Sequence, residues 1–357
     1  MTVSSQKARV PAADGLGRRG GGGPMTVVEL AMYPGLPGRL FPPEVAARLR
    51  AVAEIDLASP LTEFRSPEAR DRLRRATILL TGWGSPALDE EALAGAPGLK
   101  AVVHAAGTVK GHLSPAVFAR GIQVSSAAAA NAVPVAEYTI AMILLANKAV
   151  PALAREYRAR REDLGLIRRG HDVGNHGRVV GVVGASRIGR RVLALLRPFD
   201  LSPLLADPHV DAATAASLGA RLVGLDEIFQ LSDVVSLHAP ATPRTRGMVT
   251  ARRLASMRDG ATLLNTARGS LVDQDALVAE LVTGRLSAVL DVTEPEVPPA
   301  GSPLWELPNV VLTPHVAGSL GNEVARLGAA AVEEVLRLAA DEPLLHPVDP
   351  ETLAITA

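Results

Sequence analysis

The chain has no cysteine, although it is 357 residues long. It therefore has no disulfide, no thiolate zinc site and no cysteine nucleophile, and its composition fits a reducing, cytoplasmic compartment. We expect no bound metal. An excess of charge is also missing, because 37 basic residues balance 37 acidic ones. Proteins that bind nucleic acid usually carry a basic excess, so this balance disfavours nucleic acid as a main partner.

Long uninterrupted apolar runs are absent too. The longest run, Ala132 to Val150, contains two charged residues and a tyrosine, which is typical of a buried helix and not of a membrane span. Residues 1–24 are rich in Gly and Arg and hold no apolar segment of signal-peptide length. We expect a disordered extension there, no membrane association, and Met25 as an alternative start to Met1.

Short apolar runs alternate with helical patterns along the remaining sequence, which predicts an α/β fold with parallel sheets. The first set of expected strands comprises Val27–Leu30, Ala53–Leu57, Ala76–Leu80, Lys100–His104 and Ile122–Ser125. The second set comprises Val179–Gly184, Pro203–Asp207, Val234–His238, Thr262–Thr266, Ala288–Val292 and Val310–Thr313. We expect a long helix, roughly Val133 to Arg158, between the sets, and an amphipathic helix over Asn322–Ala340. Two sets of strands indicate two domains.

A turn between strand and helix near the start of the second set has the pattern of a dinucleotide fingerprint. In Gly184-x-Ser186-x-x-Gly189 the helix N-terminus would hold a pyrophosphate. Ser186 stands where the fingerprint has its middle glycine, so the motif alone could also be a structural turn. Asp207 ends the next strand, where a carboxylate accepts from ribose hydroxyls and repels a 2′-phosphate. This placement favours NAD over NADP.

Three polar side chains follow strands of the second set. Arg268 closes ATLLNTARG, Glu296 follows VLDVTEPE, and His315 ends VVLTPH. The carboxyl ends of parallel strands meet at one edge of a sheet, so these residues are expected in one cleft. A guanidinium can hold a planar carboxylate, and an imidazole oriented by a carboxylate can move a proton. Glu294 competes with Glu296 for the acid role. Taken singly, Arg268 could be a helix-start residue and His315 a satisfied loop histidine.

Several motifs in order make the sequence, from about Met25 onward, similar to the D-isomer-specific 2-hydroxyacid dehydrogenase family. They are NAVPVAEYT, GVVGASRIGRRV, HAPATPRTRGMV, NTARGSLVDQDAL, LDVTEPE and TPHVAGS. The resemblance implies two Rossmann-like or flavodoxin-like domains, with an NAD-binding domain inserted into a discontinuous substrate domain, and usually a homodimer. We place the substrate domain at residues 25–125 and 326–357 and the NAD-binding domain at 126–325.

The resemblance also implies roles for individual residues. Arg268 would bind the substrate and His315 would be the acid/base, paired with Glu296, which family spacing from Asp291 selects over Glu294. The residues implied to contact NAD are Gly184, Ser186, Arg187, Ile188, Gly189, Asp207, His238, Ala239, Pro240, Thr245, Thr266, Ala267, Asp291 and Gly318. The backbone implied to hold the substrate carboxylate is that of Ala106, Gly107, Thr108, Val109 and Lys110.

Two residues on the substrate side leave alternatives open. Lys110 stands where family members commonly have an acidic residue, and it could contact a second anionic group of the substrate or be a solvated loop lysine. Trp83, at another strand end, could line the pocket for the substrate side chain or pack between the domains.

The function that the sequence favours is NAD-dependent interconversion of a small-molecule 2-oxo acid and a D-2-hydroxy acid. One alternative on the same fold is an NAD(H)-sensing interaction protein that resembles transcriptional corepressors. Another is an enzyme that oxidises an inorganic or phosphonate anion, for which Lys110 would be more relevant.

Overall fold

Two sheets organise the described residues, 26–169 and 173–353, of the computed structural model. The strands of the first are β1 (Thr26–Ala31), β2 (Ala53–Glu54), β3 (Ile78–Thr81), β4 (Ala101–His104) and β5 (Gln123–Ser126). The strands of the second are β6 (Val179–Val183), β7 (Ser202–Ala206), β8 (Arg221–Leu222), β9 (Val234–Leu237), β10 (Thr262–Asn265), β11 (Ser287–Leu290) and β12 (Val310–Leu312). The disordered extension predicted for residues 1–24, and the choice of start, lie outside the described residues.

The strand orders are those of two doubly wound folds. The first sheet runs β2-β1-β3-β4-β5, and the second runs β12-β11-β10-β9-β6-β7-β8, and neighbouring strands in both sheets are parallel. These are the flavodoxin-like and Rossmann orders, which bind ligands where the strand order reverses. The reversals lie between β1 and β3 and between β6 and β9. The predicted fold class is confirmed.

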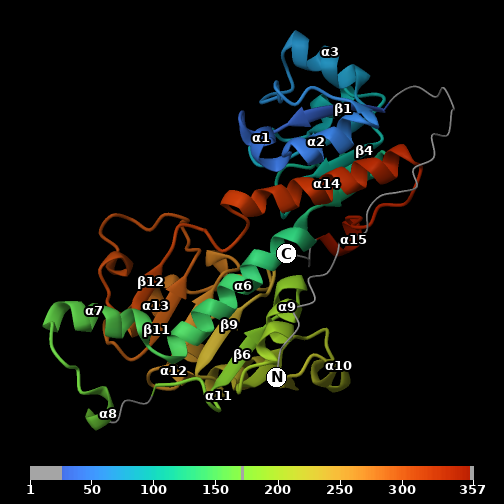
Figure 1. The fold of residues 1–357 in the computed structure, drawn as a ribbon. Helices are drawn as coiled ribbons and strands as arrows, with labels where there is room; N and C mark the ends of the chain where they lie inside the picture. Colours follow the sequence, from blue (N-terminus) through green and yellow to red (C-terminus); the bar gives the residue numbers. More distant parts are fainter. Residues whose placement is uncertain (1–25, 170–172, 354–357) are drawn as a thin grey trace, which may run out of the picture.

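Helices cover both faces of each sheet, and the two sheets form separate lobes (Figure 1). The helices are α1 (Leu36–Leu40), α2 (Pro43–Arg50), α3 (Pro67–Arg75), α4 (Glu90–Ala94), α5 (Pro115–Ala119), α6 (Ala128–Asn147), α7 (Val150–Arg160), α8 (Leu166–Arg169), α9 (Arg187–Leu196), α10 (Ala212–Ser217), α11 (Leu225–Leu231), α12 (Ala251–Ser256), α13 (Gln274–Val282), α14 (Val324–Ala339) and α15 (Pro350–Leu353). Short 3-10 turns are η1 (Gly269–Leu271), η2 (Pro303–Trp305) and η3 (Gly321–Glu323).

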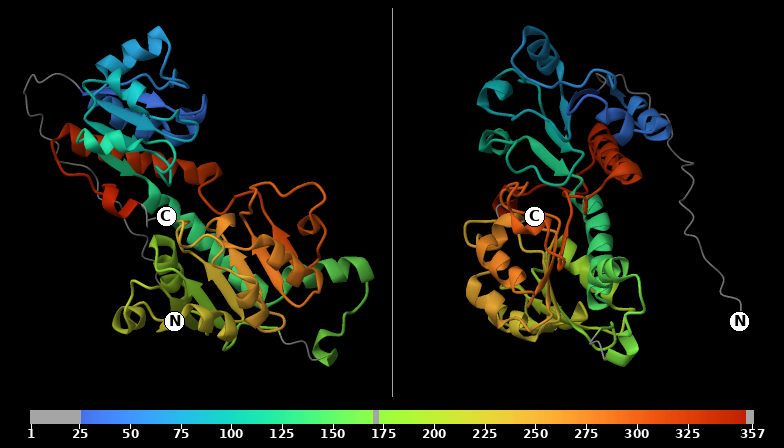
Figure 2. Two further views of the ribbon diagram at one scale, coloured as in Figure 1. Left: turned by 180° about the vertical axis from the view of Figure 1, so that it is seen from behind. Right: turned by 90° about the vertical axis from the view of Figure 1, so that its left-hand side faces the viewer.

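Helix α14, from the C-terminal part of the chain, completes the N-terminal lobe. Its buried stripe, which includes Val324, Leu327 and Val335, belongs to the same hydrophobic cluster as β1, β3 and β4. A Cβ at Gly328 would lie 1.7 Å from the carbonyl oxygen of Leu40, so α14 packs directly on the backbone of α1. Figure 2 shows this helix against the blue lobe in both views. The predicted discontinuous domain is therefore present, while its boundaries at 125/126 and 325/326 stay predictions.

The single helix predicted from Val133 to Arg158 is wrong, because the structure has two helices there. Helix α6 starts earlier, at Ala128, and keeps Pro134 in its interior. Ala149, with φ at 49°, turns the chain before α7, whose first turn contains Pro151. In the described part of the chain, α6 is the one helix long and apolar enough to cross a membrane. It packs against α9, β9, β10 and α14, as the core helix of a folded domain does.

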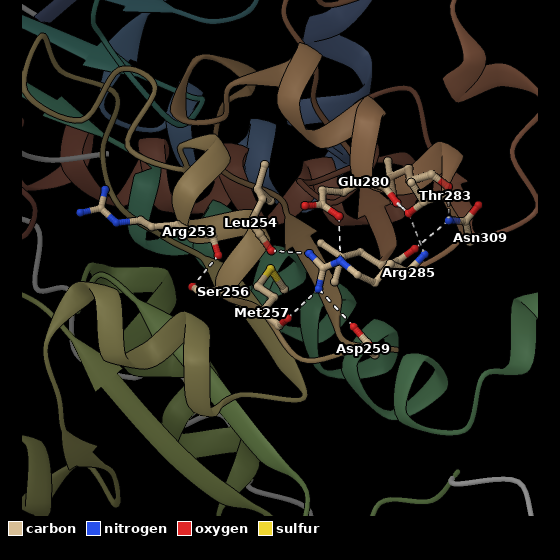
Figure 3. Close-up of polar contacts among 11 residues, drawn as sticks. Arg253, Leu254, Ser256, Met257, Asp259, Glu280, Thr283, Arg285 and Asn309 are labelled. Carbon is tan, nitrogen blue, oxygen red and sulfur yellow. Dashed lines mark hydrogen bonds and ion pairs between the residues drawn. The ribbon is translucent and has the colours of Figure 1, made fainter.

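Arg285 joins α12 and α13 next to the amino end of β11, opposite the carboxyl ends of the strands (Figure 3). Its guanidinium donates to the carbonyl oxygens of Leu254 and Met257 at 2.7 Å, and to Glu280 at 2.7 Å. The Glu280 carboxylate raises the pKa of Arg285. These bonds tie the C-terminal end of α12 and the residue that follows it to the start of β11, in addition to the Met257 N–H bond that Leu254 accepts at 3.1 Å. This network holds the helices at the amino ends of the strands in the sheet that carries the candidate site.

Candidate active site

The carboxyl ends of the two sheets open onto one cleft of about 2000 Å³. In the second sheet Asn265 pairs with Leu290, and Leu290 pairs with Leu312, so β10, β11 and β12 end side by side. The residues that follow these strands include Arg268 and His315, and both line the cleft. The in-register strand ends explain why residues far apart in sequence meet there.

Most of the predicted site residues line this cleft, and the others do not belong to its lining. Those that line it are Trp83, Gly107, Thr108, Gly184, Ser186, Arg187, Ile188, Asp207, Ala239, Pro240, Thr245, Thr266, Arg268, Asp291, His315 and Gly318. Those outside its lining are Ala106, Val109, Lys110, Gly189, His238, Ala267 and Glu296. The side chain of His238 is buried and lies 2.8 Å from the Ser236 hydroxyl, so only its backbone is near the cleft.

The turn between β6 and α9 needs two of its glycines for steric reasons. Gly184 has a φ of +99°, and a Cβ on it would lie 2.7 Å from the backbone nitrogen of Ala239. A Cβ on Gly189 would lie 2.0 Å from the carbonyl oxygen of Gly184. Ser186, in place of the middle glycine, caps α9 by accepting from the Gly189 N–H at 3.3 Å. The turn keeps its tight geometry, and the serine satisfies one of the free N–H groups at the helix start.

Asp207 closes β7 at the same end of the cleft. Its carboxylate accepts from the N–H groups of Ala185 at 2.6 Å and His209 at 2.8 Å. Val210, Leu222 and Val223 line the cleft beyond it with apolar side chains. A glycine turn, a helix N-terminus, a carboxylate and an apolar slot are the groups that a dinucleotide needs for its pyrophosphate, ribose and base. The residues present therefore fit such a cofactor.

The loop of His315 is held by the carboxylate of Asp291, which is 1% exposed. Asp291 accepts from the Thr313 hydroxyl at 2.6 Å and from the N–H groups of Val316 and Ala317 at 2.8 and 2.9 Å. His315 itself has a φ of +56°, a left-handed conformation that is rare for residues other than glycine. The structure thus gives Asp291 a firm role in positioning this loop.

The imidazole of His315 is paired with Glu296. Its Nδ1 lies 2.6 Å from a Glu296 carboxylate oxygen, which makes Nδ1–H the donor and leaves Nε2 for a ligand. The competing carboxylate, Glu294, instead binds Arg246 at 2.9 Å. The side chains of the pair are 50% and 58% exposed, so a substrate can reach the imidazole from the cleft. An imidazole in this arrangement can donate and accept a proton.

Arg268 lies in a loop that leaves little backbone freedom. The amide side chain of Asn265 donates to the Arg268 carbonyl at 2.9 Å and accepts from the Ala267 N–H at 3.0 Å. A Cβ on Gly269 would lie 2.1 Å from the backbone of Thr293, so this glycine lets the Arg268 loop pack against the segment leading to Glu296. Among the described residues, no carboxylate pairs with the Arg268 guanidinium. Its Nη1 donates to the Ala267 carbonyl at 2.6 Å, which leaves the other N–H groups of the guanidinium for an anionic ligand.

Helix α6 holds both of these loops through side chains that the sequence did not single out. Asn131 accepts from the Ser319 N–H at 2.9 Å, and the Tyr138 hydroxyl lies 2.9 Å from that of Thr313. The Thr139 hydroxyl lies 3.3 Å from that of Thr266, just before Arg268. The available signal was the motif NAVPVAEYT, which contains all three α6 residues. The helix between the domains is therefore also a support for the site.

On the substrate side, the loop after β4 is anchored by two histidines whose rings are in contact at an interplanar angle of 37°. His104, at the end of β4, lies 2.8 Å from the Thr81 hydroxyl, and its ring centroid is 4.5 Å from that of His112. Lys110 lies between these histidines in the chain and is partly buried. Burial lowers the pKa of Lys110, and so does the nearby Arg268 guanidinium. Lys110 therefore lies near enough to Arg268 for the two like charges to repel each other.

A family model described as D-isomer specific 2-hydroxyacid dehydrogenase, NAD binding domain, matches residues 140–317. A crystal structure of a Thermus thermophilus protein is 30% identical and superposes with a TM-score of 0.73, covering 91% of this chain and 100% of that one. The chain belongs to the D-isomer specific 2-hydroxyacid dehydrogenase family. The predicted resemblance and the predicted cofactor, NAD, are confirmed.

Curated members of this family give a more specific comparison. The D-3-phosphoglycerate dehydrogenase of Mycobacterium tuberculosis is 36% identical over 252 residues, which are 70% of this chain and 46% of that protein. The enzyme of the same name from Archaeoglobus fulgidus is 32% identical over 267 residues, 73% of this chain and 49% of that protein. This family member thus spans about half the length of the curated relatives that it matches.

The buried histidines of this dehydrogenase-family chain predict a loss of stability in acid. Burial lowers the pKa of His104 from 6.5 to about 3, and the neighbouring His112 lowers it further in the same direction. Burial also lowers the pKa of His238 to about 3. The unfolded chain binds protons on these rings below about pH 6.5 and the folded chain does not, so acid favours unfolding between pH 6.5 and about 3. Each ring contributes a slope of about 1.4 kcal/mol per pH unit.

Urea unfolding at a series of pH values measures this slope. In His104→Gln, which keeps a partner for the Thr81 hydroxyl, we expect a shallower slope than in the wild type, by the contribution of one histidine. Equal slopes for the two proteins would contradict the prediction.

The carboxylate of Asp207 is expected to make the protein prefer NADH over NADPH. Asp207→Asn removes the charge that repels a 2′-phosphate and weakens the acceptor for the ribose hydroxyls, and we expect the NADH to NADPH ratio of kcat/KM to fall about tenfold. Asp211→Asn is the matched control, because Asp211 caps α10 outside the cleft lining and asparagine is also a good cap. A wild type that prefers NADPH, or equal ratios in both variants, would contradict the assignment.

Proposed function

We propose that this family member catalyses the NAD-dependent interconversion of a 2-oxo acid and a D-2-hydroxy acid. The observation that carries the proposal is that Arg268 and the His315–Glu296 pair face the same cleft as the dinucleotide turn. The relatives named as D-3-phosphoglycerate dehydrogenases support a hydroxy acid as the reduced substrate.

Arg268 is proposed to hold the planar carboxylate and the adjacent carbonyl oxygen of the 2-oxo acid. Its guanidinium presents donors in a fixed fork, which suits two parallel hydrogen bonds. The backbone of Gly107 and Thr108 lines the cleft on the facing domain and can complete the carboxylate site. Binding to both domains brings the substrate across the cleft and excludes water from it.

His315 is proposed to be the acid/base. Bound NAD supplies the hydride acceptor or donor at its nicotinamide ring. In reduction, Nε2–H of His315 donates a proton to the oxygen at C2 as negative charge develops there, and in oxidation Nε2 takes that proton back. Glu296 accepts from Nδ1–H, which fixes the ring orientation and stabilises the imidazolium that forms in oxidation.

Absorbance loss from NADH tests the proposal with a panel of 2-oxo acids of varied side chain. Turnover with at least one acid, giving the D-hydroxy product on a chiral column, is the expected result. NADH binding without turnover of any acid would favour the alternative NAD-sensing role.

We further propose a homodimer in the cytoplasm, and light scattering of the purified protein tests the oligomeric state.

A further inference from the structure

The loop that carries His315 has a strained backbone and is bound to one buried residue, Asp291. The Asp291 carboxylate accepts from the Val316 and Ala317 N–H groups at 2.8 and 2.9 Å. The Asp291 carbonyl accepts from the His315 N–H at 3.0 Å. His315 has a φ of +56°, and a residue other than glycine keeps such a conformation only when its surroundings hold it there. The bonds to Asp291 therefore set the direction in which the imidazole points.

A chain of hydrogen bonds enters this loop from helix α6. The Thr313 hydroxyl donates to an Asp291 carboxylate oxygen at 2.6 Å, and the Tyr138 hydroxyl lies 2.9 Å from that of Thr313. A hydroxyl has one hydrogen, and Thr313 gives its own to the carboxylate, which only accepts. Tyr138 must therefore be the donor to Thr313, so the chain runs from Tyr138 through Thr313 to Asp291.

Helix α6 gives this chain a fixed starting point, because it packs against α9, β9, β10 and α14. It runs from the first lobe along the second sheet (Figure 1). Tyr138 is half-buried on this helix. Burial raises the pKa of Tyr138, so the hydroxyl keeps its hydrogen at neutral pH. Neither Tyr138 nor Thr313 belongs to the cleft lining, so their influence on a bound substrate passes through the His315 loop.

We propose that Tyr138 is a positioning residue for the acid/base His315, because its hydroxyl fixes Thr313 on Asp291 and so keeps the His315 loop in its left-handed conformation. The inference rests on the proposed function, in which His315 transfers a proton. Without the Tyr138 donor, the Thr313 hydroxyl is free to turn away from Asp291, and the loop gains conformations in which Nε2 of His315 points elsewhere. Small displacements of a proton donor lower the rate of the chemical step strongly.

Tyr138→Phe keeps the ring and removes only the hydroxyl, and we expect the rate constant of NADH oxidation in a single turnover to fall about tenfold. Stopped-flow absorbance with a saturating 2-oxo acid gives the rate constant and the amplitude separately. A smaller folded fraction would lower the amplitude and leave the rate constant unchanged. Tyr157→Phe is the matched control, because Tyr157 is 60% exposed on α7 outside the cleft lining. Equal rate constants in the two variants would overturn the inference.

Substitutions of Thr313 test whether Tyr138 acts through the hydrogen-bond chain. Thr313→Val loses the hydroxyl and Thr313→Ser keeps it, so the serine variant should recover most of the rate constant that the valine variant loses. When Tyr138→Phe is combined with Thr313→Val, the rate constant should fall no further than in Thr313→Val alone, because both substitutions break the same chain. Losses that multiply in the double variant, or equal rate constants for valine and serine, would overturn the inference while the proposed function stands.

Amide hydrogen exchange measures the hold on the loop without any reaction. In the full chain, without cofactor, peptides that contain the Val316 and Ala317 N–H groups are expected to exchange about tenfold faster in Tyr138→Phe than in Tyr157→Phe. Faster exchange in a protein that reduces no 2-oxo acid would reject the proposed function and keep the hold of Tyr138 on the His315 loop. Equal exchange in the two variants would reject that hold, and faster exchange with an unchanged single-turnover rate constant would reject the positioning role.

Discussion

His315→Gln is expected to lower kcat for the reduction of a 2-oxo acid by about a thousandfold. Glutamine can keep a hydrogen bond to Glu296, but it cannot deliver a proton to the oxygen at C2. The KM for the 2-oxo acid should change much less, because Arg268 and the loop after β4 still bind the carboxylate. Stopped-flow measurement of NADH oxidation in a single turnover isolates this step from product release.

The chain offers a matched control for this substitution. His176 is a highly exposed histidine that pairs with the carboxylate of Asp200, outside the cleft lining. His176→Gln therefore breaks an equivalent histidine–carboxylate pair without touching the site, and wild-type kcat is expected. A His315→Gln protein with the kcat of the control would remove His315 from the mechanism.

Arg268→Lys is expected to lower kcat/KM for the 2-oxo acid by about a hundredfold, and Arg268→Gln by about a thousandfold. Lysine keeps the charge but loses the fork that can engage a carboxylate and a carbonyl oxygen together. Both decreases in kcat/KM should be seen when the concentration of the 2-oxo acid is varied. The KM for NADH should stay within about twofold, because Asp207 and the glycine turn hold the nucleotide.

Arg252→Lys controls for the exchange itself, since Arg252 is 75% exposed and bound to Asp226 on the outer surface. We expect wild-type kinetics from it. If Arg268→Lys raised the KM for NADH and left that for the 2-oxo acid unchanged, Arg268 would belong to the cofactor site.

The strands of the fold were predictable because their apolar runs are buried on both faces. Segments such as Leu79–Thr81 and Val234–Leu237 consist mostly of Val and Leu, the residues typical of parallel strands that are buried on both faces. Strand β8, Arg221–Leu222, was missed because two residues with one exposed arginine give no pattern. The break between α6 and α7 had a signal in Pro151, because proline is common in the first turn of a helix.

The site was predictable where its residues follow strands directly and not where they come from elsewhere. Arg268 and His315 inherit their positions from in-register strand ends, so strand order brings them together. Glu296 needed family spacing, and only the structure places it, and not Glu294, against His315. Contacts such as Asn131 to Ser319 join segments 188 residues apart, and no local pattern contains that information.

The packing of α14 imposes an order on the biosynthesis of this chain. The strands of the first sheet leave the ribosome early, but Val324, Leu327 and Val335, which close their core, are made only after every strand of the second sheet. The inserted NAD-binding domain has all of its strands and can fold before that. Until α14 arrives, the nascent chain carries an open apolar sheet beside a finished domain, and exposed surface of this kind is what chaperones and proteases act on.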